Sequence, residues 1–377
     1  MDREQTQASR SWECREALHA IASEHGMSLI ELLAGLFVAT LVVAGAYTVL
    51  TTSQKATRSN DQVVETQQNV RIAMDMLSRD IKHAGFGWTG PVAGPGGTTC
   101  ATPIVPMDNT PAGNDTGPDS IRLAVPIGSS IAPAWTLAGT VGGNGNSIPQ
   151  ITLPAGAVAN MTTEAGGNLV GAIVTIGGAA TATVSAVGGD TLTFPPIPPP
   201  AAFPAGMPVY LLQCVTYAIG TTAAACGTGS PCLLRNGVSV ADGIEDIQFA
   251  YACDGCVAAV NGGVADRIID DQPNPAQSNS FDQADFITNN TWATSPMTAD
   301  KIRLVQITVV ARQTVADQGI GERQSAAAFS PAALQVSDHN HGLGLFAAGD
   351  FGTLNPPYSQ FRRRTLTRTV ETRNQRL

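Results

Sequence analysis

A nearly uninterrupted apolar run from Met27 to Leu50 constrains this chain more than any other feature. Folded as a helix, the run would be roughly 36 Å long, and the hydrocarbon core of a membrane is about 30 Å thick. We therefore predict a membrane-spanning helix. A secretory signal peptide fits less well, because its cleavage site follows a shorter apolar core, whereas here the small residue Gly26 precedes the run. An uncleaved signal anchor is the plain alternative.

A single acidic residue, Glu31, interrupts the run near its start. An acid within a membrane is costly, and by default it indicates a functional partner. If cleavage after Gly26 made Met27 a new amino terminus, a positive charge would lie one helical turn from Glu31. In an assembly, the amine of one subunit could pair with Glu31 of its neighbour. The acid would then set the register between subunits.

Beyond Leu50 the sequence becomes polar but keeps a helical period. The periodicity predicts an amphipathic helix whose apolar face packs on a globular core and which ends at residues 85–87, where Gly suits a left-handed cap. Opposite charges four residues apart, at Arg71 and Asp75 and at Asp75 and Arg79, are expected to pair along the helix. The apolar positions of the stripe are Val63, Val70, Met74, Leu77 and Ile81.

The rest of the chain has the composition of a β-rich globular region. Gly (39) and Pro (24) are plentiful and only 14% of residues are charged, which favours short strands and turns. Asn236-Gly237 is a hairpin signal. The predicted fold class is α+β, with a long N-terminal helix packed on a mainly antiparallel β domain. The expected segments are a leader (1–26), a transmembrane or fibre-core helix (27–50), its amphipathic continuation (51–85), a Gly/Ala/Pro-rich β region with long loops (86–207) and an antiparallel β region with cysteine-stapled loops (208–377).

Seven cysteines indicate an oxidising compartment. Cys14 precedes the expected cleavage site, so an even set remains after cleavage. Disulfides are the favoured use of this set, but its connectivity stays open. A four-thiolate zinc site is the alternative for the last four members, and it is less favoured in an exported domain. The disulfide candidates are Cys100, Cys214, Cys226, Cys232, Cys253 and Cys256.

Other candidate chemistry is weaker. His339 and His341 beside Asp338 could bind a metal, although a solvated loop is the favoured interpretation. The sequence contains no catalytic motif that we recognise, so we expect no enzyme activity, no catalytic residue, no metal and no cofactor. A basic end could contact DNA phosphates, but pairing with the protein's own acids or with a neighbouring subunit is favoured, and the net charge is −9. We therefore expect no direct contact with nucleic acid. The basic residues are Arg362, Arg363, Arg364, Arg368, Arg373 and Arg376.

The stretch GMSLIELL at residues 26–33 resembles the type IV prepilin signature. This resemblance implies that a prepilin peptidase cuts between Gly26 and Met27 and N-methylates Met27, and that Glu31 is the assembly glutamate. The leader departs from the family pattern. Residues 1–26 hold three Arg and five acids without a positive cluster, and the leader is longer than most.

Three further stretches narrow the resemblance. RIAMDMLSRDIKHAGFG (71–87), residues 208–256 and residues 301–312 are similar to PilW-like minor pilins. The resemblance implies a role in starting or assembling the tip complex of a type IV pilus, and so in twitching, adhesion and DNA uptake. The implied partners are the prepilin peptidase, other minor pilins, the major pilin and a tip adhesin.

The same resemblance implies a location. The helix would make a single pass through the inner membrane, with a periplasmic globular domain that reaches the pilus tip after assembly. Two alternatives remain open: a type II secretion pseudopilin of the J type, and a membrane-anchored adhesive or binding domain that does not polymerise. A J-type pseudopilin is normally shorter and lacks the large middle region.

Overall fold

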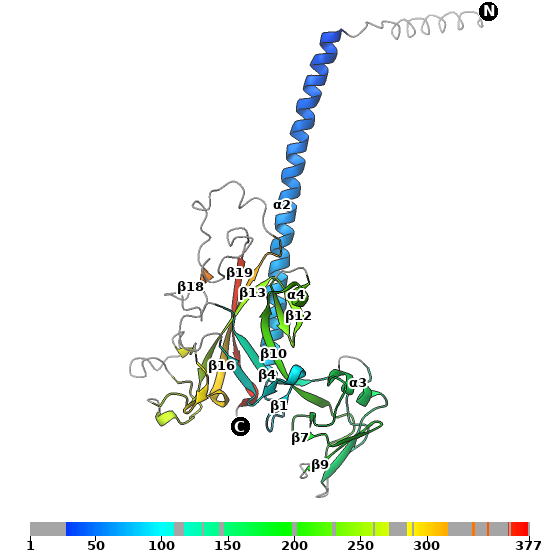
Figure 1. Ribbon diagram of the computed structural model, residues 1–377, viewed down its shortest axis with the longest axis vertical. Helices are drawn as coiled ribbons and strands as arrows, with labels where there is room; N and C mark the ends of the chain where they lie inside the picture. Colours follow the sequence, from blue (N-terminus) through cyan, green and yellow to red (C-terminus); the bar gives the residue numbers. More distant parts are fainter. Residues whose placement is uncertain are drawn as a thin grey trace, which may run out of the picture. The chain divides into compact units, whose positions relative to one another are not determined.

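A computed structural model shows an α+β fold with one long helix and mainly antiparallel strands, as predicted (Figure 1). The chain divides into two compact units, residues 1–61 and 62–377, which are described separately. The structure describes residues 28–108, 117–129, 132–142, 147–197, 202–227, 231–258, 261–270, 285–288, 290–315, 334–335, 345–346, 361 and 363–375.

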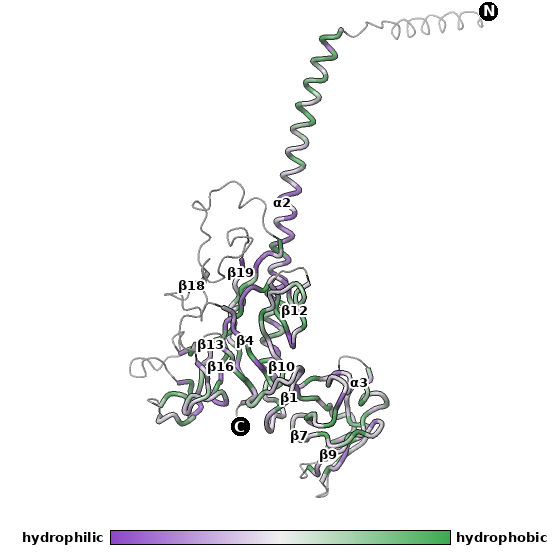
Figure 2. Tube along the Cα trace, in the orientation of Figure 1, coloured by the Kyte–Doolittle hydropathy of each residue, from purple (hydrophilic) through white to green (hydrophobic). Residues whose placement is uncertain are grey.

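Helix α2 runs from Leu29–His83 without a break. Its first hydrogen bonds join the amides of Glu31 and Leu32 to the Ser28 carbonyl. The helix ends because Gly85 adopts the left-handed conformation, with φ of 82°. Figure 2 shows that the N-terminal part of α2 is hydrophobic and that hydrophilic residues follow.

The larger sheet has seven strands built around β10, which pairs antiparallel with β4, β11 and β6. Between β11 and β12, Asn236 and Gly237 both have positive φ, so this hairpin is confirmed. The strands are β3 (Ile104–Met107), β4 (Ser120–Ile127), β6 (Ile173–Ile176), β7 (Ala180–Thr183), β10 (Val209–Gly220), β11 (Cys232–Arg235) and β12 (Val238–Asp242).

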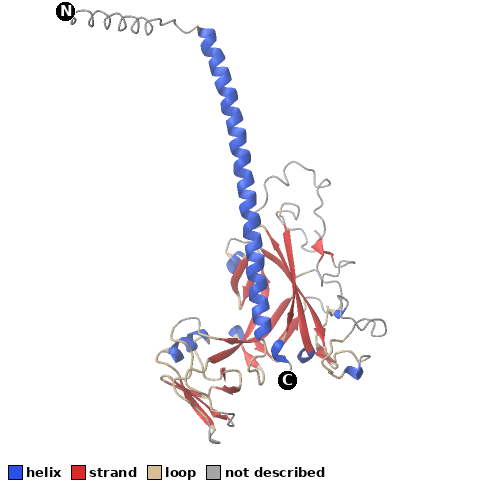
Figure 3. Cartoon of the chain, turned by 180° about the vertical axis from the view of Figure 1, so that it is seen from behind, coloured by secondary structure: helices blue, strands red, loops and turns tan. Residues whose placement is uncertain are grey.

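A second sheet has the order β13-β16-β19 and joins segments far apart in the sequence. β13 (Ile244–Cys253) pairs with β16 (Ile302–Arg312), which in turn pairs with the C-terminal strand β19 (Arg363–Glu371). The C-terminal part of α2 shares one hydrophobic core with this sheet and the seven-stranded sheet. Figure 3 shows that part of the helix lying across the strands.

The chain between β4 and β10 contains a separate core. We call residues 128–208 the inserted module. Its core includes Trp135, Leu153, Met161 and Phe194, all of which are buried. The module contains helix α3 (Ala157–Glu164) and a sheet of β5 (Ile148–Thr152), β9 (Thr191–Ile197) and β8 (Ala186–Gly188), and it also supplies β6 and β7.

Short elements complete the described chain. They are β1 (Val92–Ala93), η1 (Pro95–Gly97), β2 (Thr99–Cys100), α4 (Ala223–Cys226), η2 (Asn261–Gly263), β14 (Ala293–Thr294), β15 (Met297–Thr298), η4 (Ala299–Lys301), β17 (Leu334–Gln335), β18 (Leu345–Phe346) and η7 (Arg373–Gln375).

Candidate functional site

The N-terminal part of α2 exposes a continuous set of large apolar side chains. Leu29 is 79% exposed, Phe37 64% and Val49 70%. By length and composition, α2 can cross a membrane. Water-exposed apolar surface of this size is unfavourable, so the segment requires lipid or other helices around it. The predicted transmembrane-capable helix is present.

Glu31 lies in the first turn of α2 and is exposed. A carboxylate is favourable there, because the first amides of a helix lack intrahelical partners and carry partial positive charge. Within the described residues, no group binds its side chain. Gly26 and Met27, the predicted processing residues, lie outside the described residues, so the structure does not test the expected pairing of a new terminus with Glu31.

The C-terminal part of α2 is anchored by its apolar face. Val70, Met74, Leu77 and Ile81 are buried in the shared core, as the stripe predicts, whereas Val63 is half-buried. Their spacing of three and four residues keeps them on one side of the helix. This face fixes the helix on both sheets.

A polar triad of the buried Asp80 and Tyr217 and the half-buried Arg235 lies against that apolar face. Tyr217 Oη, on β10, donates a hydrogen bond to Asp80 Oδ2 at 2.7 Å. Arg235 Nε, on β11, donates to the same oxygen at 3.0 Å and to Tyr217 Oη at 3.1 Å. Hydrogen bonds are directional, so the triad fixes the register of α2 against β10 and β11. Apolar packing alone would allow the helix to shift along these strands more easily.

Both of the partners of Asp80 have shifted pKa values. Burial, followed by the charge of Asp80, raises the pKa of the Tyr217 phenol well above its usual value. Burial lowers the pKa of the Arg235 guanidinium, but the charges and hydrogen bonds of Asp80 and Tyr217 together outweigh burial, so the net pKa rises. Tyr217 therefore remains a neutral donor, and Arg235 remains a cation.

A pH-dependent stability follows from the raised pKa of Tyr217. The contribution of Tyr217 to the free energy of unfolding is complete below the ordinary tyrosine pKa of 10.0. It is lost as the pH rises above that value, because the phenol then ionises in the unfolded chain but not in the folded one. We expect the free energy of unfolding to fall by about 1.4 kcal/mol per pH unit there. Denaturant titrations of the detergent-solubilised chain between pH 8 and about pH 11 would measure this slope. Tyr217→Phe should reduce it, and an equal slope in that variant would contradict the assignment.

A second contact anchors the helix at its surface. Arg368 Nη1, on β19, donates to Asp75 Oδ1 at 2.8 Å. The predicted pairs of Asp75 with Arg71 and with Arg79 are not formed, and this part of the prediction was wrong. A strand from the far end of the chain supplies the cation instead, which periodicity within the helix cannot reveal.

The C-terminal strand is also held by a buried ion pair. Arg363 donates to Glu245 through Nε at 2.6 Å and through Nη2 at 2.9 Å. Arg312, whose guanidinium lies 4.1 Å from the Phe361 ring centroid, has its pKa lowered by burial even though Glu245 opposes the shift. Arg363 and Arg368 thus pair with the protein's own acids, which was the favoured interpretation of the basic tail. Arg362 and Arg376 lie outside the described residues.

All six downstream cysteines are joined in disulfides. The pairs are Cys100–Cys214, Cys226–Cys232 and Cys253–Cys256. The pairing separates the four cysteines of the zinc alternative into two disulfides, which removes the thiolates that zinc would need. The structure thus supplies the connectivity that the sequence left open.

Removal of the short disulfide has a predictable cost. The Cys226–Cys232 bond closes a separation of six residues, so we expect the double substitution Cys226→Ser and Cys232→Ser to lower the free energy of unfolding by about 2 kcal/mol. Equilibrium unfolding in denaturant, with and without a reductant, would measure it. A reductant that destabilises the double variant as much as the native chain would show that the other two bonds carry the effect.

The described residues contain one cluster of potential metal ligands, formed by Cys253, Cys256 and Asp270. The Asp270 carboxylate accepts hydrogen bonds from the amides of Gly255, Cys256 and Val257. Since the sulfurs form a disulfide and the carboxylate is already bonded, this cluster is structural. The predicted metal candidate at His339 and His341 beside Asp338 lies outside the described residues.

Residues 215–374 match a family model described as type IV pilus-assembly protein W. The chain is PilW-like. The match covers less than half of the chain. Among solved structures, a type IV-like pilin from Thermus thermophilus is similar at 12% identity, over 84% of this chain and 98% of that chain, with a TM-score of 0.29. No curated protein matches the sequence.

The strand residues that form polar contacts with the helix lie in the PilW-like region. Tyr217, Arg235 and Arg368, which bind aspartates of the helix, lie within residues 215–374. Glu245 and Arg363, which hold the C-terminal strand, lie there too. The description of the family model refers to assembly of a type IV pilus.

The sequence did not reveal the triad of Asp80, Tyr217 and Arg235, or the ion pair between Arg363 and Glu245. One signal was available: Asp80 lies next to Ile81 and three residues from Leu77, so an acid falls within the stripe predicted to be buried. Such an acid requires a partner. The partner's identity was hidden, because Tyr217 and Arg235 lie 137 and 155 residues further along the chain.

Proposed function

We propose that this PilW-like chain is a minor pilin that takes part in starting or assembling the tip complex of a type IV pilus. The observation that carries the proposal is the combination of a PilW match at residues 215–374 with an exposed apolar helix bearing one acid, Glu31. In this proposal, prepilin peptidase cleaves between Gly26 and Met27 and methylates Met27. The chain performs no chemistry of its own.

The physical basis of assembly is the exposed surface of residues 29–50. In the bilayer this surface contacts lipid, and on leaving the bilayer it would be covered by the apolar helices of neighbouring subunits. Glu31 is the charged group within that surface, and its carboxylate would pair with the amino-terminal nitrogen of the next subunit. An ion pair within an apolar interface specifies register more than it adds stability.

The remaining assignments follow from this role. Residues 1–26 are the leader, 27–50 the membrane or fibre-core segment, 51–85 the amphipathic continuation, and 86–207 and 208–377 the two β regions. The chain makes a single pass with its globular part in the periplasm before assembly, and it reaches the pilus tip afterwards. The proposed partners are the peptidase, other minor pilins, the major pilin and a tip adhesin.

Deletion of the gene tests this role against the alternatives. We expect loss of surface pili and of twitching, with secreted enzymes unchanged, and restoration of both by the native gene. Lost secretion with normal piliation would instead identify a J-type pseudopilin. Normal piliation and normal secretion would favour a binding domain that does not polymerise.

A further inference from the structure

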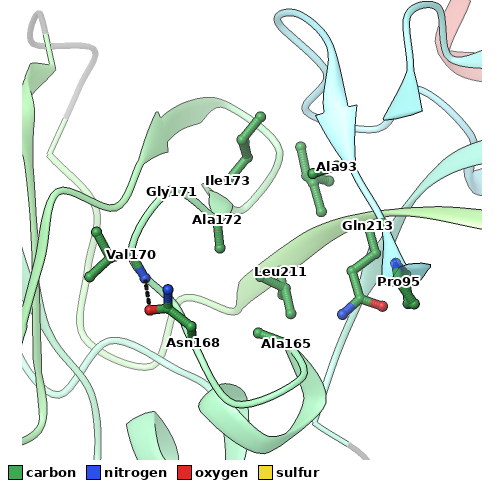
Figure 4. A pocket seen from close by; sticks show the side chains of 12 residues that line it. Ala93, Pro95, Ala165, Asn168, Val170, Gly171, Ala172, Ile173, Leu211 and Gln213 are labelled. Atoms are coloured by element: carbon green, nitrogen blue, oxygen red, sulfur yellow. Dashed lines mark hydrogen bonds between the residues drawn. The ribbon is translucent and has the colours of Figure 1, made fainter. Parts of the chain in front are cut away.

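A pocket of about 280 Å³ lies where three segments of the chain meet (Figure 4). One wall is the turn at residues 93–95, after β1. Another is β10 at residues 211–213, and the third is the stretch 165–173 that follows α3 in the inserted module. All of these residues precede residue 215, so the pocket lies outside the PilW match. The family model therefore gives no information about the pocket.

Two side-chain amides face this pocket, and each keeps one polar group without a partner among the described residues. Asn168 Oδ1 accepts the Val170 amide at 2.9 Å, which leaves Nδ2 as a free donor. Gln213 Nε2 donates to the Glu164 carbonyl at 2.7 Å, which leaves Oε1 as a free acceptor. Figure 4 shows both side chains around the same space. One donor and one acceptor are the complement of a peptide group.

The rest of the lining consists of Gly, Ala, Pro and aliphatic residues, and it contains no charged side chain. Val170 is 51% exposed at its rim. The charge depletion extends well beyond the pocket: from Leu123 to Leu234, the charged residues are Glu164 and Asp190, both acidic. Neither of these side chains lines the pocket, so a charged ligand would lose hydration without gaining a counter-ion from the lining. The pocket therefore favours an uncharged ligand.

The walls of the pocket are held in place before any ligand binds. A Cβ atom at Gly94 would overlap the Cys214 carbonyl oxygen, so the turn lies directly against β10. The Cys100–Cys214 disulfide ties β2, the partner strand of β1, to β10. On the opposite wall, Leu169 is buried in the core of the inserted module. Such preorganisation lowers the entropy cost of binding.

We propose that this pocket binds a short, uncharged, extended peptide segment of a partner protein. Asn168 Nδ2 donates to a carbonyl of the segment, and Gln213 Oε1 accepts an amide hydrogen. A small apolar side chain packs against Val170 and Ala172. The volume lies just below the range of about 300 to 1,000 Å³ for pockets that enclose small molecules, so it admits only two or three residues.

The test uses the full chain in neutral detergent and blocked pentapeptides as probes. The first probe is acetyl-AVTAV-amide, and the charged counterparts are acetyl-AETAV-amide and acetyl-AKTAV-amide. Titration followed by NMR of the side-chain amides should show Asn168 and Gln213 responding to the uncharged peptide, with a dissociation constant of about 1 mM. Both charged peptides should bind roughly tenfold more weakly.

Variants separate recognition from folding. Asn168→Ala and Gln213→Ala should each lower the affinity for the uncharged peptide roughly tenfold, because each removes one hydrogen bond to it. Gln150→Ala, an exposed amide on β5 outside the pocket, should have no effect. If Gln213→Ala fails to fold, the exposed Asn168→Ala decides the result alone.

Three results would overturn the proposal: no response at about 10 mM uncharged peptide, equal binding of the charged peptides, or full binding by folded Asn168→Ala. The readout uses purified protein and does not depend on piliation. The proposed pilin role can therefore fail while this proposal stands, and the reverse also holds.

Discussion

Asp80→Asn is expected to lower the free energy of unfolding of the globular unit by about 3 kcal/mol. The substitution keeps the size of the side chain but removes the negative charge that Arg235 and Tyr217 share. Arg235 would then remain beside the core without a counter-ion, and the desolvation of such a cation is costly. Urea unfolding of the detergent-solubilised chain, followed by circular dichroism of the strands, measures the change.

Asp75→Asn provides the matched control. It alters a second aspartate on the same helix, which also contacts an arginine on a strand, but the side chains of Asp75 and Arg368 are 69% and 44% exposed. Solvent screens this pair, so the loss should be below about 1 kcal/mol. Equal destabilisation by the two substitutions would contradict the view that the triad, rather than ion pairing in general, anchors the helix.

Glu31→Ala is expected to abolish incorporation of the protein into pili while leaving its membrane insertion intact. Removal of an acid makes insertion easier, so the membrane-bound amount should not fall. Assembly should fail, because the neighbouring subunit's amine would have no carboxylate with which to pair. Immunoblots of sheared pili and of inner membranes, from cells that carry the variant as the sole copy, separate the two outcomes.

Glu65→Ala is the control for Glu31→Ala, since it removes an exposed acid further along the same helix. It should assemble normally. Normal incorporation of Glu31→Ala would show that the acid has no role in assembly. A loss of Glu31→Ala from the membrane fraction would indicate a defect in insertion or stability instead.

Local patterns in the sequence predicted the helix and one hairpin well. Val70, Met74, Leu77 and Ile81 repeat at a helical period, and a period of this kind is a direct consequence of burying one face. Asn236-Gly237 predicted its hairpin for an equally local reason, because both residues tolerate positive φ. In these cases, neighbours along the chain contained all the necessary information.

Long-range contacts were not predictable in the same way. Asp75 has possible partners four residues away on both sides, yet it pairs with Arg368, because the docking of β19 brings that arginine to the helix. The disulfide between Cys100 and Cys214 spans 114 residues, and only the pairing of β10 with its neighbours places the two together. The second core of the inserted module was missed because Gly-rich and Ala-rich strands carry a weak periodic signal.

Mass spectrometry of the mature protein tests the central claim most directly. The protein would be isolated from cells that contain an active prepilin peptidase, and its amino-terminal peptide would be sequenced. The account predicts a chain that begins at N-methylated Met27, with residues 1–26 removed. An intact junction between Gly26 and Met27 would contradict it.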